Sequence, residues 1–204
     1  MLSVAGLTCV RGDRCLFSDL EFVLNASEWL QVDGENGAGK TSLLRIVVGL
    51  LPPTEGEIRW NNQRVRENRD EFNGNLLYLG HAAAIKEELT TMENLRMNAA
   101  IAGQHVTEVD ALKALQQIGL KGREKLPARF LSQGQKHLVA LARLLVSPAL
   151  LWVLDEPFVA LDATAVKMLC GLIGKHLDQG GMVLYTSHQA VALPAPGRTL
   201  KLTA

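Results

Sequence analysis

Residues 29–50 read WLQVDGENGAGKTSLLRIVVGL, an apolar strand-like run followed directly by a glycine-rich turn and a helix-like segment. The turn from Gly34 to Thr41 matches the pattern GxxxxGK[ST]. Such a turn points backbone N–H groups inward, and the N-terminus of the following helix adds a positive dipole end. The alternative is a glycine-rich turn that arises by accident. The strand before the turn and the helix after it favour a phosphate-binding loop.

This loop predicts a role for each of its polar side chains. Lys40 is expected to reach the β- and γ-phosphates of a nucleotide, and the Thr41 hydroxyl is expected to bind Mg²⁺. Ser42, the next residue of the helix, is expected to contact the α-phosphate. The predicted nucleotide-binding residues are Gly34, Glu35, Asn36, Gly37, Ala38, Gly39, Lys40, Thr41 and Ser42.

An acidic pair follows a second apolar run. Residues 150–154 are all apolar, and they lead into Asp155 and Glu156. Carboxylates that follow a buried parallel strand lie at the carboxyl edge of the sheet, where ligands bind in α/β proteins. Asp155 is therefore predicted to hold Mg²⁺ through water, and Glu156 to orient or deprotonate an attacking water. The alternative is that the pair forms a polar turn with Pro157.

Composition limits the possible classes of protein. The chain has 204 residues, which predicts one domain spanning residues 1–204. It carries 21 basic and 21 acidic residues, so its charge does not favour binding to nucleic acid or anionic lipid. The three cysteines show no CxxC spacing, which argues against a disulfide framework or a zinc site. The apolar run at residues 42–53 contains Arg45 and falls short of the ~20 residues that span a bilayer, so no direct membrane insertion is expected.

The order of elements predicts an α/β fold in three parts. Short apolar stretches and turn residues in residues 1–32 predict an N-terminal antiparallel β subdomain. Two capping-box patterns and helical periodicity predict a helical lobe at roughly residues 85–145, inserted in a mainly parallel core sheet. Strands are expected again at residues 150–154 and 182–186, with a helix between them at roughly residues 163–177.

A phosphate loop and an acidic strand end are found in kinases, GTPases and many other ATPases. The segment Leu131-Ser132-Gln133-Gly134-Gln135 distinguishes this chain from kinases and GTPases. Ser132 and Gln135 form a capping-box pattern at the start of a helix. Capping does not explain Gly134, because glycine in a helix costs about 1 kcal/mol relative to alanine. A glycine at a helix N-terminus lets another molecule approach the backbone closely, and that end of the helix favours an anion.

With these motifs in order, the chain resembles the ABC-transporter ATPase family over essentially its whole length. Residues 131–135 resemble the family's signature motif, which binds the γ-phosphate held by the opposite subunit. Asp162, in the segment 158–162, resembles the D-loop aspartate, and His188, in Thr-Ser-His, resembles the switch histidine that contacts the γ-phosphate. The resemblance implies an ATP hydrolase with ATP and Mg²⁺ as ligands, in which Glu156 and His188 are catalytic.

The resemblance also implies a second copy of the chain. Two cassettes are expected to pair head to tail, with each ATP held between the phosphate loop of one and Ser132, Gly134 and Gln135 of the other. The chain departs from the family pattern at Arg11, where an aromatic residue usually stacks on adenine, and a guanidinium plane can stack in its place. A solvated hairpin charge is the alternative for Arg11. Val159 occupies a D-loop position that usually holds a small hydroxyl residue.

A glycine-histidine pair at residues 80–81 narrows the resemblance. His81 takes the place of a glutamine that contacts Mg²⁺ and water and senses the membrane partner in the wider family, so the resemblance implies that His81 belongs to the catalytic site. The alternative is a hydrogen-bonded histidine that fixes the turn between the strand and the helical lobe. With the short chain and segments such as LWVLDEPFVALD, it resembles the CcmA group, the ATP-binding subunits of haem exporters in cytochrome c maturation. His105, His137 and His176 are interpreted as surface or helix-face residues.

This narrower resemblance implies partners and a location. It implies integral-membrane subunits of the CcmB and CcmC type, haem transfer to a periplasmic chaperone, and a peripheral position on the cytoplasmic face of a bacterial inner membrane. Two alternatives remain, an ABC ATPase subunit for a different cargo and a non-transport ABC ATPase. A small-molecule kinase is disfavoured by Ser132–Gln135 and His188.

Overall fold

The computed structural model describes residues 1–189 and 191–202, and the chain forms two compact units. The first unit comprises residues 1–78, 149–156 and 173–204, and the second comprises residues 79–148 and 157–172. The predicted helical lobe at residues 85–145 lies within the second unit. That the chain acts as one domain stays a prediction.

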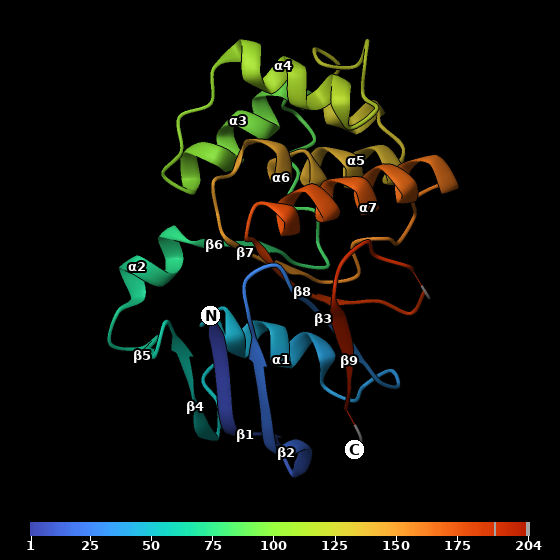
Figure 1. Cartoon of the computed structure of the whole chain (residues 1–204). Coiled ribbons are helices and arrows are strands. Elements are labelled where there is room, and N and C mark those ends of the chain that lie inside the picture. The colour runs from blue at the N-terminus through green and yellow to red at the C-terminus, as the bar shows by residue number, and fades with distance from the viewer. Residues whose placement is uncertain (190, 203–204) are drawn as a thin grey trace. The chain divides into compact units, whose positions relative to one another are not determined.

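The first unit contains the predicted antiparallel sheet (Figure 1). Its strand order is β2-β1-β4-β5, and both β2 and β4 run antiparallel to β1. The strands are β1 (Leu2–Arg11), β2 (Arg14–Leu24), β4 (Glu55–Trp60) and β5 (Gln63–Arg64). The strands β4 and β5 and the short helix α2 (Arg69–Gly74) were not predicted from the sequence.

A second sheet forms the centre of the first unit, in the order β6-β7-β8-β3-β9. The strands are β3 (Trp29–Asp33), β6 (Leu76–Leu79), β7 (Leu151–Leu154), β8 (Met182–Thr186) and β9 (Gly197–Lys201). The pairings β7–β8, β8–β3 and β3–β9 are all parallel, so a mainly parallel core sheet is confirmed. The carboxyl ends of β3, β7 and β8 therefore share one edge of the sheet.

Helix α1 (Lys40–Val47) follows β3 and packs its apolar side into the core. Leu43, Leu44 and Val47 of α1 are fully buried, as are Leu30 of β3 and Leu184 of β8. Each such side chain contributes about 1.5–3 kcal/mol by leaving water. This packing fixes the N-terminus of α1 beside the carboxyl edge of the sheet.

A stacked pair of aromatic rings joins β7 to the C-terminal part of helix α7 (Ala163–Asp178), and both rings belong to the first unit. The rings of Trp152 and His176 lie 3.7 Å apart between centroids and 5° from parallel. His176 Nε2 donates to the Leu150 carbonyl oxygen at 3.2 Å. Gly181 has no room for a Cβ, because that atom would clash with the His176 ring. His176 is thus a half-buried packing residue as well as a helix-face residue.

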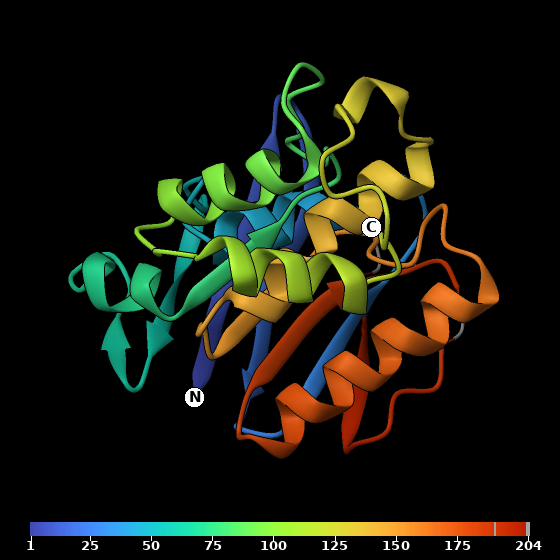
Figure 2. The ribbon, with the colours of Figure 1, turned by 90° about the horizontal axis from the view of Figure 1, so that it is seen from above.

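The second unit holds helices of the predicted lobe, two of which begin with the predicted capping boxes. They are α3 (Thr91–Ile101), α4 (Glu108–Gln117), α5 (Gln133–Leu141) and α6 (Arg143–Val146). Thr90 with Glu93, and Ser132 with Gln135, form complete capping boxes, and Thr107 caps α4. Helices α3 and α4 lie side by side in Figures 1 and 2.

A buried asparagine organises the segment before α3. The Asn94 side chain is fully buried, and its Oδ1 accepts a hydrogen bond from the Lys86 backbone N–H at 2.8 Å. Its Nδ2 donates to the carbonyl oxygens of Lys86, Leu89 and Thr90. A buried amide with both ends satisfied fixes this backbone, since breaking such bonds costs about 1–3 kcal/mol each.

Within residues 1–189 and 191–202, no helix has both the length and the apolar character needed to cross a membrane.

The His176 stack predicts a pH-dependent stability. Burial lowers the pKa of His176, and hydrogen bonds to the backbone of Leu150 and Met182 oppose that shift. Because the folded pKa lies below the unfolded value of about 6.5, the unfolded chain binds the proton more readily. The stabilisation is complete above that value and is lost as pH falls through the folded pKa.

Chemical denaturation at about pH 7.5 and about pH 5.5 measures this loss. The variant His176→Phe keeps a stacking ring but removes the titration, so its free energy of unfolding should fall less over this interval than that of the wild type. Equal losses in both proteins would show that His176 does not carry the effect.

Candidate active site

The loop between β3 and α1 depends on backbone conformations that favour glycine. Gly37 and Gly39 have φ values of +83° and +100°, in the left-handed region. Gly34 donates its N–H to Asp33 Oδ1 at 2.8 Å, which fixes the start of the loop. A Cβ on Gly34 would lie 2.9 Å from the Leu202 carbonyl oxygen, so a larger residue is excluded there. The sequence therefore dictates this loop shape.

Lys40 and the start of α1 form a positive site inside the loop. The Lys40 side chain is only 9% exposed, and its Nζ donates to the carbonyl oxygens of Gly34 at 2.6 Å and Glu35 at 3.2 Å. The N-cap residue of α1, Gly39, provides no side-chain hydrogen bond to the first turn. Free N–H groups at a helix start, next to a buried ammonium, suit a phosphate.

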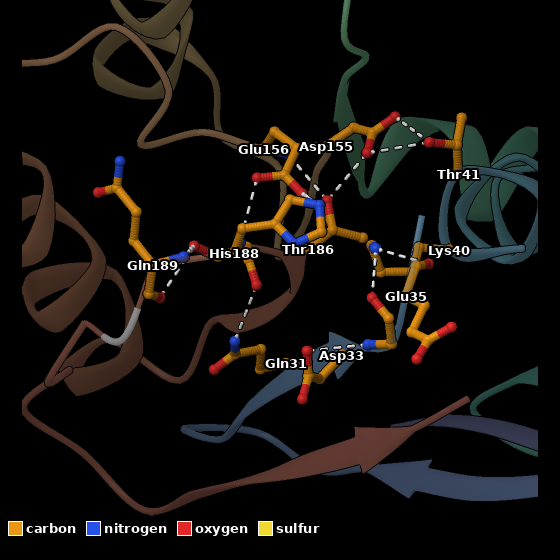
Figure 3. A network of polar contacts seen from close by, with 12 residues as sticks. Gln31, Asp33, Glu35, Lys40, Thr41, Asp155, Glu156, Thr186, His188 and Gln189 are labelled. Atoms are coloured by element: carbon orange, nitrogen blue, oxygen red, sulfur yellow. Dashed lines mark hydrogen bonds and ion pairs between the residues drawn. The ribbon is translucent and has the colours of Figure 1, made fainter. Parts of the chain in front are cut away.

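Asp155 joins three segments of the first unit (Figure 3). It follows β7 and is 4% exposed. Thr41 Oγ1, in the first turn of α1, donates to Asp155 Oδ2 at 3.0 Å. Thr186 Oγ1, the last residue of β8, donates to Asp155 Oδ1 at 2.9 Å.

These contacts test whether the site suits Mg²⁺. A hydroxyl and a carboxylate placed 3.0 Å apart are the hard oxygen donors that this ion prefers. The described residues contain no group of three or more His, Cys, Asp or Glu side chains placed to hold a metal alone. Thr41 and Asp155 therefore fit an ion that takes its other ligands from phosphates and water.

Glu156 is held in an unusual backbone conformation next to Asp155. Its φ of +55° is rare for a residue with a side chain, and such strain is kept where the surroundings impose it. Its backbone N–H donates to Thr186 Oγ1 at 2.8 Å. Its Oε1 is buried and accepts no hydrogen bond from the described residues, which leaves this oxygen able to accept a proton.

His188 lies against this carboxylate, as Figure 3 shows. The His188 backbone N–H donates to Glu156 Oε2 at 3.4 Å, and His188 Nε2 is 3.5 Å from Glu156 Oε1. The histidine side chain is half exposed, whereas that of Glu156 is mostly buried. The structure thus brings together Lys40, Thr41, Asp155, Glu156 and His188, all of which were predicted from the sequence.

Two supporting residues had no predicted role. Thr186 belongs to the Thr-Ser-His motif, and its hydroxyl contacts the Asp155 carboxylate and the Glu156 backbone N–H. Gln31 on β3 donates from Nε2 to the Ser187 carbonyl oxygen at 3.2 Å and accepts from the Tyr185 hydroxyl at 3.2 Å. The sequence signal that could have identified Gln31 is its polar side chain in the middle of an apolar strand.

The other predicted nucleotide-binding residues lie in the loop, in the first turn of α1 and at the end of β1. Ala38 is buried, and Ser42 is half-buried in the first turn of α1. Glu35 and Asn36 are exposed. Arg11 is the last residue of β1 and is exposed.

The signature segment lies in the second unit and has the predicted cap. Ser132 Oγ accepts from the Gln135 N–H at 3.2 Å, and Gln135 Oε1 accepts from the Ser132 N–H at 3.1 Å. A Cβ on Gly134 would lie 2.7 Å from the Ala160 carbonyl oxygen. Gly134 was expected to let another molecule approach the backbone, but this contact within the chain already requires glycine.

Asp162 and His137 also have roles within the second unit. Asp162 Oδ1 accepts from the Ala165 N–H at 2.8 Å and so caps the start of α7. His137 Nε2 donates to the Pro157 carbonyl oxygen at 2.8 Å, because a carbonyl oxygen can only accept. The interpretation of His137 as a plain helix-face residue is therefore incomplete. His81 is exposed and follows the end of β6 by two residues.

The fold and this arrangement define a P-loop nucleotide-binding protein, with a glycine loop, a lysine, and an acidic pair at the end of β7 in the same sheet. The family model described as "ABC transporter" matches residues 17–159, which is more than half of the chain. The chain therefore belongs to the ABC transporter family, and the predicted fold class is confirmed.

Individual relatives support the narrower resemblance. The chain is 54% identical over 195 residues to the cytochrome c biogenesis ATP-binding export protein CcmA of Dechloromonas aromatica, covering 96% of each chain. It is 51% identical to the protein of the same name from Nitrosospira multiformis, covering 92% of this chain and 91% of the relative. A solved putative ABC transporter ATP-binding protein from Pyrococcus furiosus superposes with a TM-score of 0.83 at 25% identity, covering 98% and 96% of the two chains.

The position of Thr186 generates a test. Thr186→Val removes the hydroxyl but keeps the shape, so the buried Asp155 loses one of its two hydroxyl partners and the Glu156 N–H loses its acceptor. We expect a loss of about 1–3 kcal/mol in the free energy of unfolding, because buried polar groups are then unsatisfied. We also expect phosphate-releasing turnover to fall at least about tenfold, since each 1.4 kcal/mol of lost positioning corresponds to a factor of ten. Thr186→Ser keeps the hydroxyl and is the control. Wild-type turnover in Thr186→Val would contradict this role.

Proposed function

We propose that this chain binds and hydrolyses ATP as the ATP-binding subunit of a transporter that serves cytochrome c biogenesis. One observation carries the proposal: Lys40, Thr41, Asp155, Glu156 and His188 converge at the carboxyl edge of one parallel sheet. Two relatives, each at least half identical over nearly their whole length, carry the name of cytochrome c biogenesis ATP-binding export protein.

The arrangement of these five residues supports transfer of the γ-phosphoryl group of ATP to water. The loop N–H groups and Lys40 bind the polyphosphate and neutralise its charge. Thr41 and Asp155 would hold Mg²⁺, which supplies further neutralisation when bound. An attacking water forms the new oxygen–phosphorus bond and passes its proton to Glu156 Oε1, while the bond to the ADP oxygen breaks. His188 Nε2 is 3.5 Å from Glu156 Oε1, and we propose that this histidine holds the carboxylate in position and hydrogen-bonds the γ-phosphate.

We further propose that a second copy completes the site. Ser132 is exposed at the start of α5, a helix of nine residues, where its first-turn N–H groups favour an anion. The resemblance to the family assigns Ser132, Gly134 and Gln135 to the ATP held by the opposite copy, with Asp162 nearby in the D-loop. Gly134, Gln135 and Asp162 also have roles within the chain, and Ser132 caps α5, so a test of the pairing needs a Ser132 variant that keeps the cap.

A role in transport requires partner subunits that cross the membrane. We propose integral-membrane subunits of the CcmB and CcmC type, with the chain bound peripherally at the cytoplasmic face of the inner membrane. His81 is proposed as the sensor of that partner, because an imidazole offers one donor and one acceptor as an amide does. Its exposure and the Asn94-fixed backbone that follows it support this proposal. Haem is the proposed cargo from the subfamily resemblance; a different cargo and a non-transport role are the alternatives.

ATP turnover by purified protein tests the catalytic part. Lys40→Ala should abolish measurable ATPase activity while the protein keeps its fold, since it removes the charge beside the β- and γ-phosphates. Glu156→Gln should bind ATP but hydrolyse it at least about a hundredfold more slowly, because an amide cannot take the proton. Circular dichroism checks folding, and a coupled phosphate assay measures turnover. Hydrolysis at the wild-type rate by Lys40→Ala would refute the assignment.

A further inference from the structure

The hairpin formed by β1 and β2 carries two arginines on one face. Arg11 pairs with Arg14 in the antiparallel register, and the neighbouring pair is Val10 with Cys15. Directly paired residues place their side chains on the same face of the sheet. Side chains alternate along a strand, so Leu16 lies on the same face as Arg14.

This end of the hairpin packs onto the phosphate loop within the first unit. A Cβ on Gly39 would lie 3.0 Å from Leu16 Cβ and 3.2 Å from Phe17 Cδ1. A Cβ on Gly37 would lie 3.7 Å from the Arg14 guanidinium nitrogen Nη1. The guanidinium of Arg14 is therefore next to the middle of the loop, whereas nothing comparable places Arg11 there.

No described carboxylate pairs with the guanidinium of Arg14. Asp13 is the carboxylate next to Arg14 in the sequence, and Glu35 is the one nearest to Gly37. Neither forms an ion pair with Arg14 within residues 1–189 and 191–202. Arg11, directly across the hairpin, has the same charge, and facing like charges destabilise a strand pair. An unpaired guanidinium next to a loop of N–H groups is suited to an anion, which it can bind through two parallel hydrogen bonds.

We propose that Arg14 contacts the polyphosphate of the bound nucleotide from outside the loop. The proposal rests on the proposed function, because it requires that residues 34–41 bind a nucleotide. It differs from the expectation that Arg11 stacks on adenine. Here the residue of the hairpin that binds the nucleotide is Arg14, and the part of the nucleotide that it contacts is the phosphates. Loss of one charge-assisted contact corresponds to about tenfold in affinity.

Equilibrium binding of ADP, measured by calorimetry with the wild type and four variants, tests the proposal. Arg14→Ala should weaken ADP binding about tenfold, and Arg14→Lys should weaken it less, because it keeps the charge without the fork. Arg66→Ala, which removes an exposed arginine outside both the loop and the hairpin, is the control and should stay within about twofold. Added salt should reduce the difference between the wild type and Arg14→Ala, since the contact is screened.

A second comparison separates phosphate from base contact. The ratio of ADP to GDP affinity should be the same in the wild type and in Arg14→Ala, because both ligands carry the same diphosphate. A changed ratio, an unchanged ADP affinity in Arg14→Ala, or an equal loss in Arg66→Ala would each overturn the proposal. The fourth variant, Lys40→Ala, separates a failure of the proposed function from a failure of the Arg14 inference. If the wild type and Lys40→Ala both fail to bind ADP, the proposed function fails. If only the Arg14 difference is missing, the nucleotide site stands and this inference fails.

Discussion

The buried carboxylate of Asp155 is the constraint on which the site depends. An ionised group that is 4% exposed is tolerated only where partners replace the lost water, and here two threonine hydroxyls do so. One hydroxyl belongs to Thr41 at the start of α1, and the other belongs to Thr186 at the end of β8. Satisfying one charge therefore fixes the phosphate loop, the acidic strand end and the end of β8 in a single arrangement.

The parallel sheet explains why these groups meet although they lie far apart in the chain. Strands β3, β7 and β8 end at the same edge, and each continues into one part of the site: the glycine loop, the acidic pair and the segment with His188. The Thr186 hydroxyl donates to Asp155 and accepts from the Glu156 N–H, so one side chain aligns two carboxylates with different tasks. The positive φ of Glu156 turns its side chain toward His188.

The sequence predicts the parts of this protein that are local. The glycines of the loop, the two capping boxes at Thr90 and Ser132, and the apolar run before Asp155 each carry their signal within a few residues. What it could not predict are contacts between distant segments. Gln31 bonds to Ser187, Trp152 stacks on His176, and the Gly134 backbone lies against Ala160, and none of these pairs is visible in a local pattern.

Two residues show how a motif can carry two constraints at once. Gly134 and Asp162 resemble family positions that act between copies, yet Gly134 is also required by Ala160 and Asp162 also caps α7. A mixing experiment separates the two roles. Ser132→Asp keeps an N-cap side chain but adds a charge that repels phosphate, and Lys40→Ala disables the loop. In an equal mixture, half of the dimers carry one intact composite site, so about a quarter of wild-type ATPase activity should return from two inactive proteins. Activity no greater than the sum of the separate variants would contradict a site shared between copies.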